Sequence, residues 1–491
     1  MSKKVAIIGS GFSGLVAASI LAKNGFSVTV FEKNEQSGGR CRKWISEGFT
    51  FDMGPSWYWM PEIFENFYQI FGKTTSEFYE LIRLNPSYKV FFEDESINIP
   101  SDFTDFTALL ESIEPNATVN LNKFLEEAQY KYEVGMNDMV RKPSLSWREF
   151  VDIRIVKSVF RLQLLGSFST HIRKYFKNPK IIKLLEFPVL FLGAKPKDTP
   201  ALYSLMNYAD IKLGTWYPMK GMSEVAAAFE KIAYQQGVTI LFNANVQKIE
   251  VENNSIKTIL VNDKKHSFDY VVSSADYHHT DQNLLGDQHA SYSKKYWNSR
   301  KLSPSCLLYF IGINKKIPNL EHHNLFFDTD YEKHSNEIYD TPKFPSEPLF
   351  YVCCPSKTDN SIAPENCENL FILIPVAPDL DDSTEIQEKY LDICIKRLEK
   401  RTETSIRNSI IVQRNFGIND FKNDYNSFKG NAYGMASTLF QTAFLKPKIK
   451  HKKIKNMFFC GQLTVPGPGV PPSIISGEIV ANYIIKNEKN I

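Results

Sequence analysis

Three glycines near the start of the chain have the spacing of a phosphate-binding turn. Gly9, Gly11 and Gly14 form a Gly-x-Gly-x-x-Gly motif. In a dinucleotide site the first glycine permits a tight turn, the second lets the backbone approach a pyrophosphate, and the third lets a helix pack closely on a strand. The free N–H groups at the start of that helix attract phosphate oxygens. The alternative is a glycine-rich turn that binds no ligand.

The elements around these glycines support the dinucleotide interpretation. Residues 5–8 predict a buried parallel strand, residues 15–23 a helix, and residues 26–31 a second strand that ends at Glu32. The Glu32 carboxylate can accept hydrogen bonds from ribose hydroxyls, and its charge would repel a 2′-phosphate. Strand, glycines, helix, strand and acid in this order therefore predict a site for a dinucleotide other than NADP.

The residues beyond Glu32 narrow the choice of dinucleotide. Gly39 and Arg40 follow shortly afterwards and place flexible backbone and a cation where a bound pyrophosphate would lie. The sequence has no second Gly-x-Gly-x-x-Gly motif, and its seven cysteines include no Cys-x-x-Cys pair. A pyridine-nucleotide disulfide reductase needs a second nucleotide site and usually a redox cysteine pair. One tightly bound FAD is therefore the predicted cofactor.

The C-terminal segment predicts a second contact with the cofactor. Residues 457–461 form a short apolar strand ending in Gly461, and a turn with Gly469 and Pro471 leads into a predicted helix over residues 474–485. The start of that helix would point at the ligand of the sheet edge and stabilise an anionic reduced flavin. An ordinary helix start with proline in its first turn explains the same residues.

Composition and charge exclude several classes of protein. The chain has 491 residues, 58 Lys and Arg against 55 Asp and Glu, and a formal net charge of +3, so no nucleic-acid partner is expected. The length predicts more than one structural unit. Aromatic residues make up 13% of the chain, which suits either a large apolar binding cavity or a core rich in phenylalanine.

The cysteines, the position of the first strand and the longest uncharged stretch predict the cellular compartment of the protein. An odd number of cysteines, with no Cys-x-x-Cys pair and no histidine at metal-ligand spacing, predicts a reduced, cytoplasmic setting and no metal. The first strand begins too early to leave room for a signal peptide. The longest uncharged stretch, near residues 457–477, is interrupted by four prolines, so we expect no membrane-spanning helix.

The chain is predicted to be an α/β protein with a discontinuous Rossmann-like domain. Residues 1–75, 215–285 and 440–491 carry the strand and glycine patterns of an FAD-binding domain. Residues 76–214 and 286–439 would form an α+β substrate-binding domain, with a helical region that associates with the membrane.

The order of these segments resembles that of a known family. Residues 9–32, 38–40, 51–56, 216–222, 245–246 and 460–477 look like those of the bacterial-type phytoene desaturases, which are FAD-dependent carotenoid desaturases. Shorter segments between them fit as well, including the pair His322-His323 and residues 430–434. The resemblance covers nearly the whole chain.

The resemblance implies a substrate and a fuller set of cofactor contacts. The implied activity is the introduction of double bonds into a carotenoid dissolved in the membrane, with phytoene, γ-carotene or a hydroxylated carotenoid as possible substrates and oxygen or a quinone as the electron acceptor. The residues implied to contact FAD are Gly9, Gly11, Phe12, Ser13, Gly14, Glu32, Lys33, Gly39, Arg40, Val246, Gly461, Gly469, Val470 and Pro471.

The resemblance also suggests catalytic candidates. Around residues 145–149, members of the family tend to carry an acidic and a basic residue, which are proposed as acid and base near the substrate. In this chain the candidates are Arg148, Glu149 and Asp152. The alternative, which the pattern favours, is a solvated helix start with Asp and Glu in its first turn. Many members have a His-Pro-Gly in the C-terminal segment, whereas this chain has Val465 at the histidine position, which removes a titratable group near the flavin.

Residues 150–176 alternate apolar side chains with arginine and lysine. This pattern predicts one or two amphipathic helices on the inner face of the cell membrane, or an ordinary surface helix with a basic face. Two other functions stay open: a flavin-dependent carotenoid isomerase, and an FAD oxidase of amines or porphyrinogens.

Overall fold

The computed structural model describes residues 2–150 and 166–489. A five-stranded parallel sheet carries the N-terminal glycine motif, with the strand order β19-β13-β1-β2-β9. Its strands are β1 (Lys4–Ile8), β2 (Ser27–Phe31), β9 (Thr239–Leu241), β13 (Tyr270–Ser273) and β19 (Met457–Phe459). Because parallel strands end at the same edge, the residues after β1, β2, β13 and β19 meet there.

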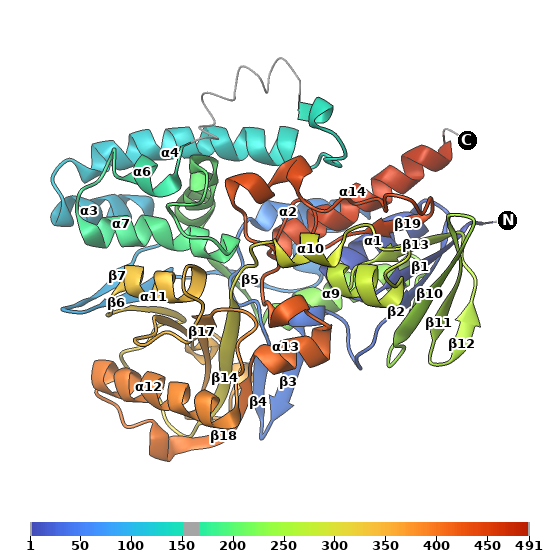
Figure 1. The fold of residues 1–491 in the computed structure, drawn as a ribbon. Coiled ribbons are helices and arrows are strands. Elements are labelled where there is room, and N and C mark those ends of the chain that lie inside the picture. Colours follow the sequence, from blue (N-terminus) through green and yellow to red (C-terminus); the bar gives the residue numbers. More distant parts are fainter. Residues whose placement is uncertain (1, 151–165, 490–491) are drawn as a thin grey trace.

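Three helices pack beside this sheet. Helix α1 (Phe12–Lys23) follows β1 directly and contacts both α9 (Met222–Gln235) and α14 (Val470–Lys489). Ten of the 12 residues of α1 are buried, which explains its apolar composition. Figure 1 shows α1 and α14 side by side next to the sheet.

A seven-stranded mixed sheet forms the second half of the molecule, in the order β18-β14-β17-β16-β15-β6-β7. The pair β15–β6 is parallel and the other pairs are antiparallel. The strands are β6 (Tyr88–Phe92), β7 (Ser96–Ile99), β14 (Ser305–Ile313), β15 (His323–Phe327), β16 (Phe350–Cys353), β17 (Glu368–Val376) and β18 (Ile410–Phe416). Every residue of β14 is buried, as expected for a central strand covered on both faces.

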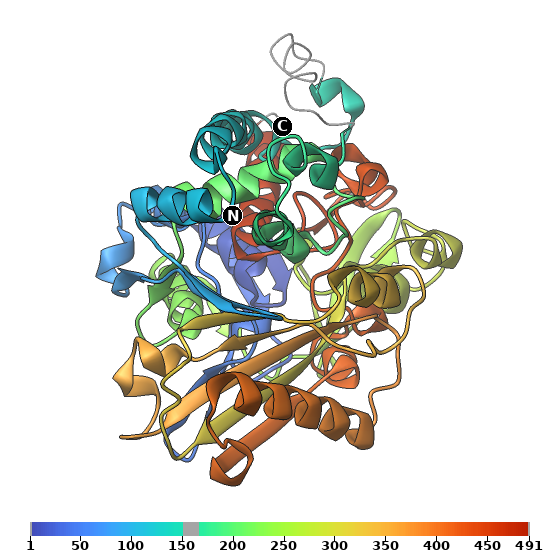
Figure 2. The same ribbon diagram turned by 90° about the vertical axis from the view of Figure 1, so that its left-hand side faces the viewer.

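Helices cover both faces of this sheet, as Figures 1 and 2 show. On one side lies a helical layer of α3 (Phe103–Ile113), α4 (Ala117–Val134), α6 (Phe168–Ile172) and α7 (Pro179–Glu186). On the other side lies α12 (Thr384–Thr402), whose buried residues Leu391, Cys394 and Leu398 pack against the sheet.

The remaining elements connect these units. Three antiparallel strands, β10 (Val246–Glu252), β11 (Ser255–Val261) and β12 (Lys264–His266), form a small sheet. The pairs β3 (Lys43–Ser46) with β4 (Phe49–Asp52), and β5 (Leu81–Arg83) with β8 (Trp216–Pro218), are two-stranded. The shorter helices are α2 (Pro61–Ile70), α8 (Leu205–Tyr208), α10 (Lys294–Asn298), α11 (Tyr331–Tyr339) and α13 (Ile418–Tyr425).

The predicted α/β fold with its parallel nucleotide-binding sheet is confirmed. The C-terminal helix begins at Val470 rather than at residue 474, because Pro471 and Pro472 suit the first turn, where a helix needs no N–H donor. All strands of the parallel sheet fall in the segments assigned to the cofactor domain, and all strands of the seven-stranded sheet fall in the substrate segments. The exact domain boundaries stay a prediction.

Among the described residues, no helix is both long enough and apolar enough to span a bilayer. Residues 151–165, which contain most of the predicted amphipathic segment and the candidate Asp152, lie outside the described residues.

Candidate active site

One cavity of about 470 Å³ runs from the edge of the parallel sheet to the apolar face of the seven-stranded sheet. Of the residues predicted to hold the cofactor, those that line it are Gly9, Gly11, Phe12, Ser13, Glu32, Gly39, Arg40, Gly461, Gly469, Val470 and Pro471. They come from four separate segments of the chain. The parallel sheet brings these segments together, because each follows or precedes one of its strands.

The glycine motif leaves a slot without side chains at this end of the cavity. A Cβ atom on Gly11 would have only one neighbour within 4 Å, the Ser274 hydroxyl at 3.9 Å. Gly11 precedes α1, and no side chain caps that helix. A Cβ on Gly39, which has a φ of 57°, would lie 3.4 Å from the Gly11 Cα. This slot and the open N-terminus of α1 fit a pyrophosphate.

Arg40 brings a cation to the same end of the cavity. Its guanidinium Nη2 donates weakly to the Ser427 hydroxyl at 3.3 Å and to the Asn431 carbonyl at 3.4 Å. Its Nε is buried and has no hydrogen-bond partner among the described residues. Burial lowers the pKa of Arg40 from its usual value. A buried donor with nothing to bond is the group that a phosphate oxygen satisfies.

Glu32 is buried at the end of β2 with its carboxylate held in place. Oε2 accepts from the Ser10 N–H at 2.8 Å and from the Ser10 hydroxyl at 2.7 Å, while Oε1 accepts from the Asn34 N–H at 2.9 Å. A carboxylate has about four acceptor positions, so it retains capacity for a ribose hydroxyl. Glu32 is thus fixed at the place where the dinucleotide fold puts a ribose.

The first turn of α14 closes the other side of the cavity. Gly469, Val470, Pro471, Pro472 and Ser473 all line it, so this helix start faces the cavity, and its contact with a bound cofactor stays a prediction. Because two of these residues are prolines, the turn offers fewer N–H donors than an ordinary helix start. Its effect on a bound group comes mainly from the helix dipole.

Three predicted cofactor residues do not line the cavity. Gly14 faces the preceding turn, and a Cβ there would lie 2.2 Å from the Gly9 carbonyl oxygen, so its role is close packing. The Lys33 ammonium donates to the Asn423 carbonyl. Val246 is buried in β10 within the core between the small sheet and the parallel sheet. Their direct contact with the cofactor stays a prediction.

The other end of the cavity is apolar and rich in aromatic side chains. It is lined by Trp57, Trp59, Phe187, Leu190, Met206, Leu308, Leu325, Phe327, Tyr331, Ile338, Tyr339, Phe350, Tyr351, Phe371, Leu373 and Tyr433. These residues come from the segment between β4 and α2, from residues 187–190, from α8 and α11, from the loop at residue 433 and from four strands of the seven-stranded sheet. No lysine is among the described residues that line any part of the cavity.

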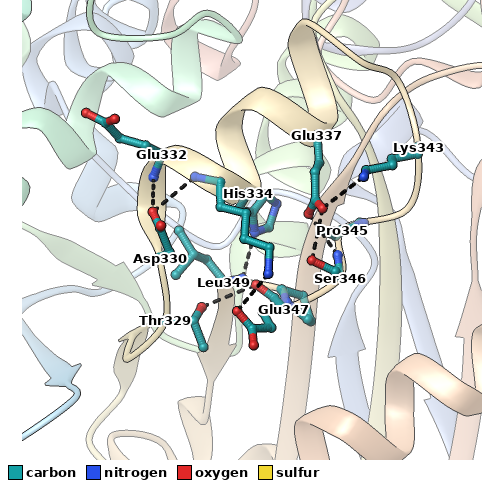
Figure 3. A network of polar contacts seen from close by, with 12 residues as sticks. Thr329, Asp330, Glu332, His334, Glu337, Lys343, Pro345, Ser346, Glu347 and Leu349 are labelled. Carbon is teal, nitrogen blue, oxygen red and sulfur yellow. Dashed lines mark hydrogen bonds and ion pairs between the residues drawn. The ribbon is translucent and has the colours of Figure 1, made fainter.

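Helix α11 contributes Tyr331, His334, Ile338 and Tyr339 to the lining of the cavity. Figure 3 shows the polar contacts that hold this helix and its His334. His334 Nδ1 accepts from the Leu349 N–H at 2.6 Å, and its Nε2 lies 3.1 Å from the Pro375 carbonyl, to which it donates. Burial lowers the pKa of His334 to about 4. With both nitrogens engaged and a neutral ring, His334 holds the wall in place and is not a free base.

Two of the three catalytic candidates, Arg148 and Glu149, do not line the cavity, and the third, Asp152, lies outside the described residues. The Glu149 carboxylate accepts from the N–H groups of Ser144, Leu145 and Ser146, at 2.9, 2.8 and 3.0 Å, and so closes a turn. Arg148 is exposed. Neither is among the residues that line the cavity. Their assignment as acid and base stays a prediction.

Sequence reasoning missed Asp276, which lines the cofactor end of the cavity. Its carboxylate accepts from the N–H groups of His279 and Phe428, at 3.0 and 3.1 Å. Burial raises the pKa of Asp276 to about 6, against the opposing charge of Arg40. Asp276 could have been predicted from the sequence, because it comes just after the strand at residues 270–273 and so lies at the ligand-binding edge of a parallel sheet.

Fold and site together define a flavoprotein whose cofactor slot opens into an apolar substrate chamber. A family model described as flavin containing amine oxidoreductase matches residues 12–485, and the chain belongs to this family. Its cofactor is FAD, and the slot beside Gly11, the unpaired Nε of Arg40 and the fixed Glu32 fit that group.

The resemblance to carotenoid desaturases is confirmed by two relatives. A carotenoid 3,4-desaturase of Haloarcula japonica is 37% identical over 485 residues, which cover 98% of each chain. A zeta-carotene-forming phytoene desaturase of Myxococcus xanthus is 29% identical over 492 residues, covering 98% of this chain and 94% of its own. A solved oxidoreductase of Methanosarcina mazei shares the fold, with a TM-score of 0.64 and 15% identity over 98% of this chain and 100% of its own.

Proposed function

We propose that this chain is an FAD-dependent carotenoid desaturase. The observation that carries the proposal is the continuity of the cofactor slot with a long chamber walled by aromatic and aliphatic side chains. Such a chamber suits a polyene hydrocarbon, which offers no polar group to recognise. Relatives named carotenoid 3,4-desaturase and phytoene desaturase, which match nearly the whole chain, support the same function.

Desaturation removes two hydrogens from adjacent carbons next to a conjugated system. Bound FAD supplies the chemistry of accepting one of them as a hydride. The walls of the chamber exclude water and hold the carbon chain of the polyene in line with the cofactor slot. This lowers the entropy cost of bringing the two reactants together. Aromatic faces such as those of Trp57, Phe187 and Phe371 stabilise positive charge that develops on the polyene.

The polyene must enter from a bilayer, and one exposed apolar patch is suited to touch it. We define the patch as Phe440, Phe444 and Leu445, which are 77%, 37% and 41% exposed. The Lys448 ammonium donates to the Ser144 carbonyl at 2.9 Å and so ties this segment to residues that precede the predicted amphipathic stretch. These observations support peripheral binding at the inner face of the cell membrane.

The alternatives differ in what happens to the flavin. An isomerase leaves FAD oxidised after turnover, whereas a desaturase passes two electrons to oxygen or to a quinone. No lysine is among the described residues that line the cavity, which disfavours an amine oxidase that relies on a lysine beside the flavin. The 3,4-desaturase relative favours a carotenoid as the substrate.

The test uses the FAD-loaded protein and liposomes that carry phytoene, lycopene, γ-carotene or a hydroxylated carotenoid in separate tubes. Each is incubated with oxygen, with a quinone, or with neither. A red-shifted product in one tube, formed with an acceptor and blocked without one, is expected. Unchanged spectra in every tube, with FAD still bound, would contradict the proposal, and a changed isomer without an acceptor would favour an isomerase.

A further inference from the structure

A buried cluster of two imidazoles and a thiol lies beside the substrate chamber. His323 in β15 and Cys353 in β16 are directly opposite each other in an antiparallel pair, so their side chains project from the same face. His322 precedes β15, and its carbonyl accepts from the Cys354 N–H at 2.8 Å. One ligand atom from each of His322, His323 and Cys353 lies within 4.8 Å of the other two.

Both imidazoles keep one nitrogen unpaired. His322 Nδ1 lies 2.8 Å from the Thr358 hydroxyl and His323 Nδ1 lies 2.6 Å from the Tyr351 hydroxyl. The Nε2 atoms of both rings are buried and have no hydrogen-bond partner in the part of the chain that the structure describes. His322 is 4% exposed and His323 is fully buried. Burying two ring nitrogens without partners costs free energy unless a ligand satisfies them.

This arrangement is that of metal-binding histidines. A histidine ligand commonly hydrogen-bonds through one ring nitrogen to a neighbouring group, which orients the ring and leaves the other nitrogen for the metal. If the Thr358 and Tyr351 hydroxyls accept from Nδ1–H, both rings have the tautomer with a lone pair on Nε2. Two such nitrogens and a thiolate form a donor set that suits zinc and similar borderline cations.

We propose that His322, His323 and Cys353 bind one divalent cation of the zinc class. Bonds of about 2.0–2.3 Å would draw the three ligand atoms closer together than in this structure, through rotation of the side chains. The Cys353 thiol gives up its proton to solvent when the metal–sulfur bond forms. Metal binding at this cluster requires neither a bound carotenoid nor desaturation activity.

A fourth ligand position has space in a separate small cavity. Its volume is about 20 Å³, and its lining includes His322, Cys353, Ser56 and Tyr217. This is room for about one water molecule. A cation with three protein ligands and one water has the coordination number that zinc prefers.

The metal would fix one wall of the substrate chamber. His323 stacks on Trp57 with ring centroids 4.0 Å apart, and its Nδ1 partner Tyr351 also contacts the Ser56 hydroxyl at 3.0 Å. Trp57, Tyr351 and Ser56 all line the main cavity. A cation on Nε2 of His323 therefore holds the aromatic wall at the point where the strands β15 and β16 face the substrate.

Because the cluster is buried, the metal is best supplied while the chain folds. The wild-type protein and its variants are expressed in defined medium with added zinc or, separately, cobalt, and then dialysed at length. Metal content is measured against protein and FAD, and the cobalt form is examined for a thiolate-to-cobalt absorption band. The variants are Cys353→Ser and His322→Asn, and Cys354→Ser is the matched control.

Cys354 is the matched control because it is equally buried, one residue away, and its sulfur points toward the Ser356 hydroxyl at 3.6 Å. We expect about one equivalent of metal in the wild type and in Cys354→Ser, and at least about a tenfold loss in both cluster variants with FAD retained. Metal content near zero in the wild type, or equal in Cys353→Ser and the wild type, would overturn the proposal.

If a cluster variant fails to fold, X-ray absorption of the wild-type zinc form identifies the atoms that bind the metal. One sulfur and two imidazole nitrogens in the coordination shell are expected. A shell of oxygen ligands alone would place the metal elsewhere and contradict the assignment.

Discussion

Gly39 and Gly11 lie next to each other at the cofactor end of the cavity, so closely that a Cβ on Gly39 would lie 3.4 Å from the Gly11 Cα. The two residues belong to different turns, one after β1 and one after β2. Gly11 has a φ of −69°, which any residue can adopt. The backbone therefore permits a side chain at Gly11, and we predict that the bound cofactor is what excludes one.

Gly11→Val should abolish FAD binding without unfolding the protein. The valine methyl groups would occupy the space of the pyrophosphate, and we expect FAD affinity to fall by at least about a hundredfold, which corresponds to about 2.7 kcal/mol. Flavin absorbance after gel filtration measures the loss. Ala227→Val, on the exposed face of α9, is the control. Equal FAD content in the two variants would contradict the placement of the pyrophosphate.

Arg40→Met should weaken FAD binding more than it weakens the fold. The unpaired Nε of Arg40 is predicted to bond a phosphate oxygen, and losing a hydrogen bond to a charged group reduces affinity about tenfold to a hundredfold. Quenching of flavin fluorescence gives the dissociation constant. Arg83→Met, at an exposed arginine, should leave the constant unchanged.

Asp210→Asn should flatten the dependence of stability on pH. Burial raises the pKa of Asp210 to about 7, although Tyr88 donates to its carboxylate at 3.0 Å. The folded state then binds more protons than the unfolded state between about pH 4 and pH 7, so the free energy of unfolding falls as pH rises through this window. Thermal unfolding at about pH 5 and about pH 8 should show a smaller difference for the variant than for the wild type.

The control for that experiment is Asp263→Asn, at an exposed turn. It should keep the pH dependence of the wild type. An unchanged slope in Asp210→Asn would assign the dependence to other buried carboxylates.

Lys446→Met should stabilise the protein at neutral pH. The Lys446 ammonium has no hydrogen-bond partner among the described residues, and burial lowers its pKa to about 7. The folded state binds fewer protons than the unfolded state between about pH 7 and pH 10.5, so wild-type stability rises with pH in this window. The variant should unfold at a higher temperature near pH 7 and lose this rise, whereas the exposed Lys453→Met should do neither. Loss of bound FAD in Lys446→Met would instead tie this lysine to the cofactor.

Replacing Phe440 and Leu445 by serine should weaken liposome binding. Each buried apolar side chain contributes about 1.5–3 kcal/mol, so the double variant should pellet with liposomes at least about tenfold less well. Ile411→Ser, at a residue 52% exposed on β18, is the control. Desaturation of a detergent-dissolved substrate should be retained in the double variant. Equal pelleting of all three proteins would exclude this patch from the membrane contact.

The cofactor end of the site could be predicted from the sequence because its parts are local. Gly9, Gly11 and Gly14 act within one turn between a strand and the helix that follows it, and Glu32 ends the adjacent strand. The order of these elements determines the geometry, since consecutive parallel strands place their ends at one edge. The C-terminal strand and α14 were predicted for the same reason, with an error of four residues at the helix start.

The substrate end was decided only by tertiary structure. Trp57, Phe187, Leu308, Tyr331 and Tyr433 are far apart in the sequence and meet because a seven-stranded sheet pairs strands over long separations. No local pattern distinguishes such residues from an ordinary aromatic core. For the same reason the sequence could not show that the carboxylate of Glu149, a candidate catalytic acid, accepts hydrogen bonds from backbone N–H groups of its own turn.

The sequence by itself determined the class of cofactor, the α/β fold and the likeness to carotenoid desaturases, since each depends on short motifs and on their order along the chain. Only the tertiary structure placed His323 opposite Cys353, because the register of β15 on β16 sets which side chains share a face. It also decided which charged groups are buried. Burial depends on everything packed around a group, and so Asp210 and Lys446 could not be distinguished from surface residues by sequence.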